Sequence, residues 1–218
     1  MKIKEIDDFQ DLKETWNTLL KNNLLGDNVF LTWEWLYTWW KHFKEGRKLL
    51  ILLVEDKDEV LAIAPLMLSK YKLPMFGTIK KVEFLGTRHS DYNNFIIVKK
   101  ATECFRLIME YLMDAITDWD WIELKEIPET AENINYLEAL FSYSPSNLKF
   151  KRHVCNICPY IKLPNSFDSL IKGLKKNMRQ NLNKYLRKLN EKHRVELKRY
   201  DEADFSVKEA MELFIRLN

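Results

Sequence analysis

The residues best suited to chemistry lie in a basic segment near the end of the chain. Between Lys172 and Arg199 there are eleven lysines or arginines and two acidic residues, whereas the rest of the chain carries more acidic than basic residues. A solvated helix face normally interleaves Glu with such cations, because like charges four residues apart repel one another. We therefore expect this segment to bind an anion, such as a phosphorylated cofactor, a nucleotide-sugar, tRNA or a lipid head group; a purely solvated face is the alternative. Arg binds phosphate in a bidentate manner, and side-chain amides can complete the site. We therefore favour four residues as contacts of the anion: Lys176, Asn177, Arg179 and Asn181.

A second candidate site is a short segment with four tryptophans, FLTWEWLYTWW at 30–40. Trp33 and Trp40 could line a groove for an acyl chain or a glycan, because indole rings stack on both. Packing between a sheet and a helix is the other interpretation. Glu34 stands among these rings and would serve as a general base if its pKa were raised; a solvent-facing carboxylate is the alternative.

A third candidate is the polar stretch TRHSDYNN at 87–94, which separates two apolar runs. Within it, Asp91 could orient a nucleophilic amine and Tyr92 could protonate a leaving thiolate. An exposed turn without a chemical role explains the same residues.

Three further residues are of the types that bind metals: His153, Cys155 and Cys158. A single C-x-x-C pair is a weak zinc signal, and in a strand its two cysteines would face opposite sides. We expect no metal site and interpret these cysteines as inert buried thiols.

Composition excludes several functional classes. The chain has 218 residues, of which 46% are hydrophobic and 31% charged, so it should form a folded domain with a real core. Its five glycines lie at least nine positions apart, which rules out phosphate-binding loops and nucleophile elbows that need closely spaced glycines.

We also expect a cytoplasmic protein. The longest apolar runs, 49–54 and 61–68, are far shorter than the roughly 20 residues that span a bilayer. Residues 1–10 carry three acids and no apolar region that would mark a signal peptide.

Hydrophobic periodicity predicts an α/β protein, a mixed sheet flanked by helices. Strands are expected at 2–6, 49–55, 60–69, 82–85, 95–98, 119–124 and 195–200, and those at 49–55 and 60–69 should form a hairpin. Helices are expected at 9–20, 32–43, 104–116, 131–141, 167–192 and from 204 onward, with Thr32 as the N-cap of the second. The helix at 167–192 is the long basic one, and 149–163 is expected to be extended.

The order of these elements, with three segments of sequence, resembles the GCN5-related acyltransferases of the GNAT superfamily. The segments are FLTWEWLYTWW at 30–40, EFLGTRHSDYNNF at 83–95, and the stretch from Pro159 to Leu189 that opens PYIKLP and contains LKKNMRQNL. They are similar to the CelD-like branch, which is related to Fem-type peptidyltransferases and carries two GNAT-like halves in tandem. Asp91 and Tyr92 resemble an Asp-Tyr pair of that family.

The resemblance implies an acyltransferase that moves an acyl group from acyl-coenzyme A, such as acetyl-CoA, to an amine or hydroxyl of a sugar or cell-envelope precursor. It implies a first GNAT-like domain at 1–164 and the start of a second, incomplete one at 165–218. Because the chain lacks the family's glycine-containing pyrophosphate loop, we expect the cofactor to bind outside this chain, which alone would be inactive with acyl-coenzyme A. A following sheet would cover the apolar face formed by Phe205, Met211, Phe214 and Leu217 in a complete tandem protein. In this chain alone, that helix should fold back on the first half, fray or mediate self-association.

Two other functions remain open at this point. One is an α/β module that binds an anion or nucleic acid through the basic helix. The other is a Fem-type transferase that uses aminoacyl-tRNA and would need the same basic face. Nucleic-acid-binding surfaces usually interleave aromatic residues with cations, and Tyr185 alone does so in 172–192, which favours a small anion.

Overall fold

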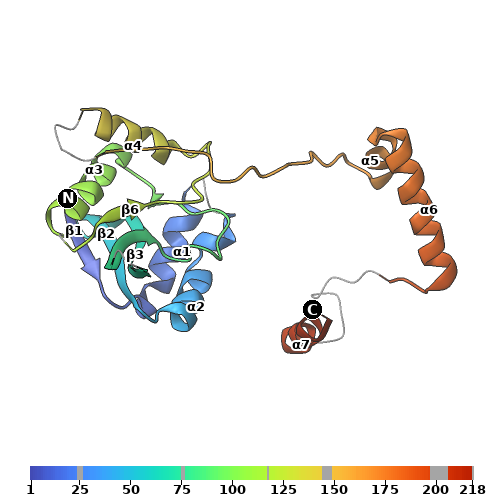
Figure 1. Ribbon diagram of the computed structural model, residues 1–218, viewed down its shortest axis with the longest axis horizontal. Coiled ribbons are helices and arrows are strands. Elements are labelled where there is room, and N and C mark those ends of the chain that lie inside the picture. Colours follow the sequence, from blue (N-terminus) through green and yellow to red (C-terminus); the bar gives the residue numbers. More distant parts are fainter. Residues whose placement is uncertain (24–26, 75–76, 117, 144–148, 197–205, 218) are drawn as a thin grey trace. The chain divides into compact units, whose positions relative to one another are not determined.

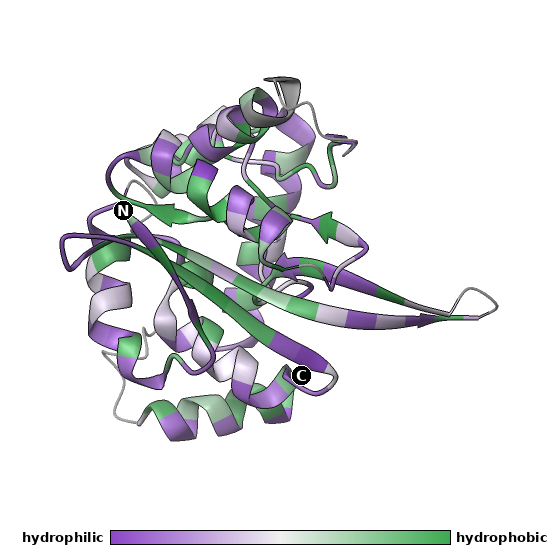
Figure 2. Ribbon diagram, turned by 90° about the vertical axis from the view of Figure 1, so that its left-hand side faces the viewer, coloured by the Kyte–Doolittle hydropathy of each residue, from purple (hydrophilic) through white to green (hydrophobic). Residues whose placement is uncertain are grey.

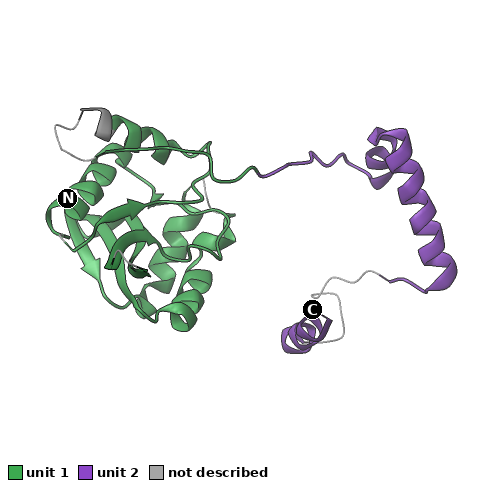
Figure 3. Cartoon of the chain, in the orientation of Figure 1, with its two compact units in different colours: residues 1–157 green, residues 158–218 purple. Residues whose placement is uncertain are grey.

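The computed structural model describes residues 1–23, 27–74, 77–116, 118–143, 149–196 and 206–217. It divides into two compact units, Met1–Ile157 and Cys158–Asn218 (Figure 3). This division and the predicted domain boundary at 164 both fall within residues 149–164, which form neither helix nor strand. Each unit is described by itself.

A six-stranded sheet forms the centre of the first unit. Its order is β1-β2-β3-β4-β6, with β5 paired to β3. The strands are β1 (Lys2–Ile6), β2 (Arg47–Asp56), β3 (Glu59–Leu73), β4 (Gly77–Phe84), β5 (Ile96–Ile97) and β6 (Trp121–Glu123). All pairs are antiparallel except β4 and β6, which are parallel. The predicted fold class, a mixed sheet flanked by helices, is confirmed.

Helices cover both faces of this sheet (Figure 1). They are α1 (Lys13–Lys21), α2 (Trp33–Phe43), α3 (Ala101–Asp114) and α4 (Glu132–Tyr143), and two short 3-10 turns lie at Gln10–Leu12 and Val29–Leu31. One core cluster joins the sheet to α3 and α4, and contains Leu50, Leu66, Phe84 and Phe105. A second joins the other face to α1 and α2, and contains Trp16, Leu36, Ile51 and Met67.

The central hairpin of β2 and β3 forms for reasons visible in the sequence. Residues 49–54 are all buried, because helices cover both faces of β2. The strands are joined by Lys57 and Asp58, whose φ values of 49° and 68° are those of the type I′ turns that suit hairpin twist. The hairpin was predicted, but β3 is longer than expected.

β4 and β5 behave as one long strand interrupted by a loop. β4 pairs with β3 up to Phe84 opposite Leu66, and β5 resumes with Ile96 opposite Ile63. Residues 85–95 leave the sheet between these two points. We call them the strand-break loop.

The outer part of the β3–β4 hairpin extends past the helices (Figure 2). Side chains there are exposed or half-buried, and Lys70, Lys72 and Lys80 make this end hydrophilic. The face that α1 and α2 cover in the middle of the sheet is therefore open near β4 and β6.

The second unit corrects the predicted long helix at 167–192. The structure has α5 (Phe167–Gly173) and α6 (Lys176–Lys192), separated by Leu174 and Lys175 in extended conformation. The break follows Gly173, a poor helix former, among lysines that repel one another. α6 remains long and basic, as predicted.

The rest of the second unit differs from expectation in part. Val195 and Glu196 form no strand, and the remainder of the predicted strand at 195–200 lies outside the described residues. The last helix, α7 (Val207–Leu217), exposes 50% of Met211, 60% of Phe214 and 75% of Leu217, while Phe205 lies outside the described residues.

The prediction that Cys155 and Cys158 are buried is wrong, because both are exposed. No helix of the described residues is long and apolar enough to cross a bilayer.

The strand-break loop offers a stability test at Gly86. Its φ of +90° suits glycine, and an added Cβ would lie 2.5 Å from Ser90 Oγ and 3.0 Å from Leu36 Cδ2. We expect Gly86→Ala to lower the free energy of unfolding by about 2–3 kcal/mol, measured by urea denaturation.

The matched control is Gly46→Ala, where φ is +73° but nothing lies within 4 Å of the new Cβ. It should show only the conformational cost, about 1 kcal/mol. Equal losses in both variants would contradict a tight fit between the loop and α2.

Candidate functional site

The cavity of about 530 Å³ on the open face of the sheet lies over β3, β4 and β6. It continues past the carboxyl ends of the parallel strands β4 and β6, where Arg88 and Glu126 line it. Ligands of α/β sheets commonly bind at such strand ends, and pockets for small molecules have volumes of about 300–1,000 Å³. The side chains that give this cavity its chemistry are Tyr71, Lys81, Glu83, Arg88, Trp121 and Glu123.

A buried carboxylate is the first of these groups. Glu83 on β4 is only 3% exposed, and the hydroxyl of Tyr71 donates a hydrogen bond of 2.6 Å to its Oε2 atom. Burial, together with the neighbouring Glu83 charge, raises the pKa of Tyr71, so this hydroxyl keeps its proton at neutral pH. A cavity-lining carboxylate with a fixed proton donor beside it can accept a proton from a bound molecule.

An ion pair at the edge of the sheet is the second feature. Lys81 Nζ lies 2.9 Å from Glu123 Oε2, and Lys125 Nζ lies 3.3 Å from Glu123 Oε1. Burial acts to raise the pKa of Glu123, but the hydrogen bond and charge of Lys81, together with Lys125, lower it below its ordinary value. The Lys81 ammonium also lies 5.3 Å from the ring centre of Trp121 and 5.4 Å from that of Tyr71.

Arg88 stands in the strand-break loop at the rim of this cavity. Its guanidinium carbon lies 5.3 Å from the ring centre of Tyr71, a cation–π distance. Its backbone has a φ of 81°, which is uncommon for a residue other than glycine.

Indole N–H groups hold the strand-break loop in place. Trp35 Nε1 donates to Ser90 Oγ, and Trp39 Nε1 donates to His89 Nδ1, both at 2.9 Å. From the other side, the backbone N–H of Asn93 donates to the Glu126 carbonyl at 2.8 Å. The loop is thereby fixed to α2 and to the segment that follows β6.

Asp91 and Tyr92 lie in this loop but do not line the cavity. Asp91 is exposed, and Tyr92 is half-buried with its ring 6.3 Å from that of Phe30. The carbonyl of Tyr92 accepts a hydrogen bond from the side chain of Asn28. Their predicted catalytic roles stay predictions.

Trp33 and Trp40 also lie apart from the cavity, because both pack against the core cluster beneath α1 and α2. The indole N–H of Trp33 donates to the Phe9 carbonyl at 2.8 Å, and its ring stacks on Tyr37 at 4.4 Å. The geometry favours the packing interpretation of these tryptophans over a groove for a glycan.

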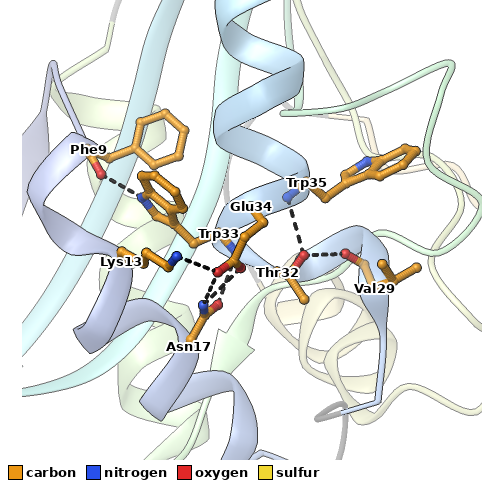
Figure 4. A network of polar contacts seen from close by, with 8 residues as sticks. All are labelled: Phe9, Lys13, Asn17, Val29, Thr32, Trp33, Glu34 and Trp35. Carbon is orange, nitrogen blue, oxygen red and sulfur yellow. Dashed lines mark hydrogen bonds and ion pairs between the residues drawn. The ribbon is translucent and has the colours of Figure 1, made fainter. Parts of the chain in front are cut away.

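Glu34 belongs to a polar network that joins the starts of α1 and α2 (Figure 4). Its carboxylate accepts hydrogen bonds from Asn17 Nδ2 at 2.9 and 3.1 Å and lies 3.0 Å from Lys13 Nζ. The hydrogen bond from Asn17, and then Lys13, lower the pKa of Glu34 despite slight desolvation. A general base near neutral pH needs the opposite shift, so this geometry does not support that role. Thr32 accepts from the Trp35 N–H, which confirms the predicted N-cap of α2.

The predicted anion contacts lie on α6 in the second unit. Lys176, Asn177 and Asn181 are exposed. Arg179 is half-buried, and its Nη1 atom donates to the Lys172 carbonyl at 3.2 Å, across the break between α5 and α6. One nitrogen of this guanidinium therefore caps the end of α5, while Lys176 and the two amides are open to solvent.

The cavity residues were missed by the sequence analysis, although one signal could have found them. Strand positions 79, 81 and 83 carry Ile, Lys and Glu, whereas the neighbours 80, 82 and 84 carry Lys, Val and Phe. Charged residues at alternate positions of a strand beside a buried strand indicate a face that meets water or a ligand. Among the described residues, no group of three His, Cys, Asp or Glu side chains could hold a metal ion.

Neither a protein-family model nor a curated protein matches the chain. Among solved structures, it is similar to an aminoglycoside acetyltransferase from an uncultured soil metagenomic sample, with 13% identity over 71% of this chain and 98% of that one, at a TM-score of 0.43. It is also similar to an aminoglycoside 6'-N-acetyltransferase from Acinetobacter haemolyticus, with 11% identity, 74% and 100% coverage and a TM-score of 0.40. An integron cassette protein from V. cholerae matches at 14% identity, 79% and 98% coverage and a TM-score of 0.39. Likenesses of this degree establish neither a family nor an activity.

The Glu123 ion pair generates a prediction about pH. Because the folded-state pKa lies below the ordinary value of 4.5, the pair contributes stability above pH 4.5 that is lost as the pH falls through the folded-state pKa. The difference in unfolding free energy between the wild type and Glu123→Gln should be constant near pH 7 and shrink below pH 4.5, measured by urea denaturation at each pH.

The control removes the main partner of this carboxylate. When Glu123→Gln is compared with Glu123 in protein that also carries Lys81→Met, the difference in unfolding free energy should depend less on pH. The reason is that Lys81 is the main cause of the lowered pKa of Glu123. An unchanged pH dependence in the Lys81→Met background would contradict the assignment.

Proposed function

We propose that the chain belongs to an acyltransferase of the GNAT superfamily, of the CelD-like tandem type, with 1–164 as its first GNAT-like domain and 165–218 as the start of a second. It transfers an acyl group from acyl-coenzyme A to an amine or hydroxyl of a sugar or cell-envelope precursor. The observation that carries the proposal is the cavity at the ends of β4 and β6, with the buried Glu83–Tyr71 pair in it. The three resembling sequence segments support the same conclusion.

The Glu83–Tyr71 pair supplies the proton chemistry that acyl transfer requires. An amine or hydroxyl must lose a proton when it attacks an acyl carbon, and Glu83 lines the cavity where such a group would lie. Tyr71 is the donor that holds the carboxylate in place. This pair takes the role that the sequence analysis gave to Asp91, Tyr92 or Glu34.

The acyl donor supplies an activated thioester when bound. The start of α3, the one α-helix that begins directly after β5, does not fit a pyrophosphate. Its neighbouring cations are already paired, Lys99 with Glu59 at 2.6 Å and Lys100 with Asp56 at 2.5 Å, and Glu103 stands in the first turn. We therefore do not assign the cofactor phosphates to the start of α3.

α6 fits an anionic group better. Its first turn has no acid, and Lys176, Asn177 and Asn181 are exposed along it. In this proposal α6 holds the phosphates of a substrate or cofactor, with Arg179 both capping α5 and contributing charge.

The same helix favours a second candidate function, an anion-binding or RNA-binding module, which includes the Fem-type use of aminoacyl-tRNA. The observation behind it is the excess of exposed cations on α6. Small phosphorylated ligands and RNA differ in how their binding depends on salt, because RNA releases many counterions.

Charge reversal on α6 separates these alternatives. We expect Lys176→Glu with Arg179→Glu to weaken binding of coenzyme A and UDP-N-acetylglucosamine about tenfold or more, measured by calorimetry. Binding of single-stranded RNA alone, with a steep fall in affinity as salt rises, would favour the binding module. Equal affinities in wild type and variant would contradict a role of α6 in anion binding.

The carboxylate test uses a thioester that does not depend on a pyrophosphate site. S-acetyl-N-acetylcysteamine keeps the reactive thioester and lacks the nucleotide, so its reaction with glucosamine reports on the cavity. We expect the wild-type chain to accelerate thiol release and Glu83→Gln to lower the rate about a hundredfold, because Gln cannot accept the proton.

The matched control is Glu126→Gln, at the rim of the same cavity, where Asn156 Nδ2 holds the carboxylate at 2.9 Å. It should keep most of the activity. A Glu83→Gln variant as active as the wild type would contradict the proposed role of Glu83.

A further inference from the structure

The charged groups of the cavity are paired with one exception. Glu123 is held by Lys81 and Lys125, Glu126 by Asn156, and Glu83 by Tyr71. Arg88 is exposed, and within the described part of the chain its guanidinium has one recorded contact, the ring of Tyr71. Its N–H donors are therefore uncommitted, at the mouth of a cavity whose other cations, Lys81 and Lys125, both contact Glu123.

The backbone at Arg88 is the second observation. A φ of 81° is unfavourable for a residue with a Cβ, and such conformations persist where the surrounding structure imposes them. Here the neighbours on both sides are fixed, since Gly86 packs against α2 and His89 accepts the indole N–H of Trp39. This fixed backbone carries the Arg88 side chain, whose guanidinium lies over the Tyr71 ring.

One aromatic ring, that of Tyr71, lies 5.3 Å from this guanidinium, and a second, that of Trp121, lines the same cavity. Tyr71 is immobilised by its hydrogen bond to buried Glu83, and Trp121 on β6 remains 55% exposed. Exposed indole rings stack well on the apolar faces of sugars. A planar guanidinium binds a carboxylate or phosphate through two parallel hydrogen bonds.

We propose that this cavity binds an acceptor that carries an oxyanion, a carboxylate or phosphate on a sugar, with the anion on Arg88 and the ring against Trp121. This substrate class is assigned to the same cavity as in the proposed function, and the assignment rests on that function. Tyr71 connects this anion site to the proton acceptor, because its ring lies under the Arg88 guanidinium and its hydroxyl donates to Glu83.

The test is equilibrium binding without any acyl donor, so that it does not depend on turnover. Glucosamine 6-phosphate and glucuronic acid are titrated into the 218-residue chain by calorimetry, with glucose as the neutral reference. We expect one or both anionic sugars to bind, and more tightly than glucose. The phosphate and carboxylate probes show which oxyanion the site prefers.

Arg88→Gly removes the guanidinium and, because glycine adopts a φ of 81° without strain, should be at least as stable as the wild type. We expect it to weaken binding of the anionic sugar about tenfold or more, and Arg88→Lys to recover part of the loss. Arg106→Gln, which changes the same charge on the surface of α3, should bind as the wild type does.

Three results would overturn the proposal. The first is equal affinity of the wild type and Arg88→Gly for the anionic sugars. The second is that the wild type binds the anionic sugars no more tightly than glucose. The third is that binding is lost only when the charges of Lys176 and Arg179 on α6 are reversed. Failure of acyl transfer with these binding results intact would instead contradict the proposed function alone.

Discussion

Double coverage of the β2–β3 hairpin is the constraint on which the rest of the first unit depends. Residues 49–54 are buried on both faces, one set of side chains against α3 and α4 and the other against α1 and α2. The helices, however, do not extend over β4 and β6 on the second face. Side chains of β4 and β6 meet solvent there. The same sheet therefore supplies an apolar core at its centre and a polar cavity over β3, β4 and β6.

The tryptophans of α2 connect this core to the cavity. A buried indole must place its N–H on an acceptor, since an unpaired donor is costly. Trp35 and Trp39 use Ser90 and His89 as acceptors, and both acceptors belong to the strand-break loop that carries Arg88. Core packing and the position of the cavity rim are thus determined by the same side chains.

Much of the first unit could be predicted from periodicity, because its elements combine local signals with burial. Thr32 caps α2, and the apolar runs around residues 56–59 form the expected hairpin. The start of β4 was predicted too late in the chain, since 77–81 are Gly, Thr, Ile, Lys and Lys, a stretch that a search for apolar runs overlooks. The break at Gly173 was missed because the helical pattern of apolar residues continues across it.

The candidate site was less predictable than the fold. Polar residues in a loop, such as Asp91, attract attention in a sequence, whereas Glu83 and Tyr71 lie within strands twelve residues apart. Only the register that places Met67 opposite Glu83 and Tyr71 opposite Ile79 brings their side chains together on one face. Register depends on the whole hairpin and is not encoded by either residue.

The interruption between β4 and β5 has an evolutionary consequence. Because both strands pair with β3 on either side of the gap, and the Leu85 N–H already bonds to the Pro65 carbonyl, the sheet is complete without the residues in between. Insertions, deletions and exchanges there would alter the entrance of the cavity while leaving the scaffold's hydrogen-bond ladder intact. A lineage could diversify what it recognises by exchanging the exposed Arg88 and Asp91 of this segment, provided that it keeps Gly86, the buried Leu85 and Phe95, and acceptors for the two indoles.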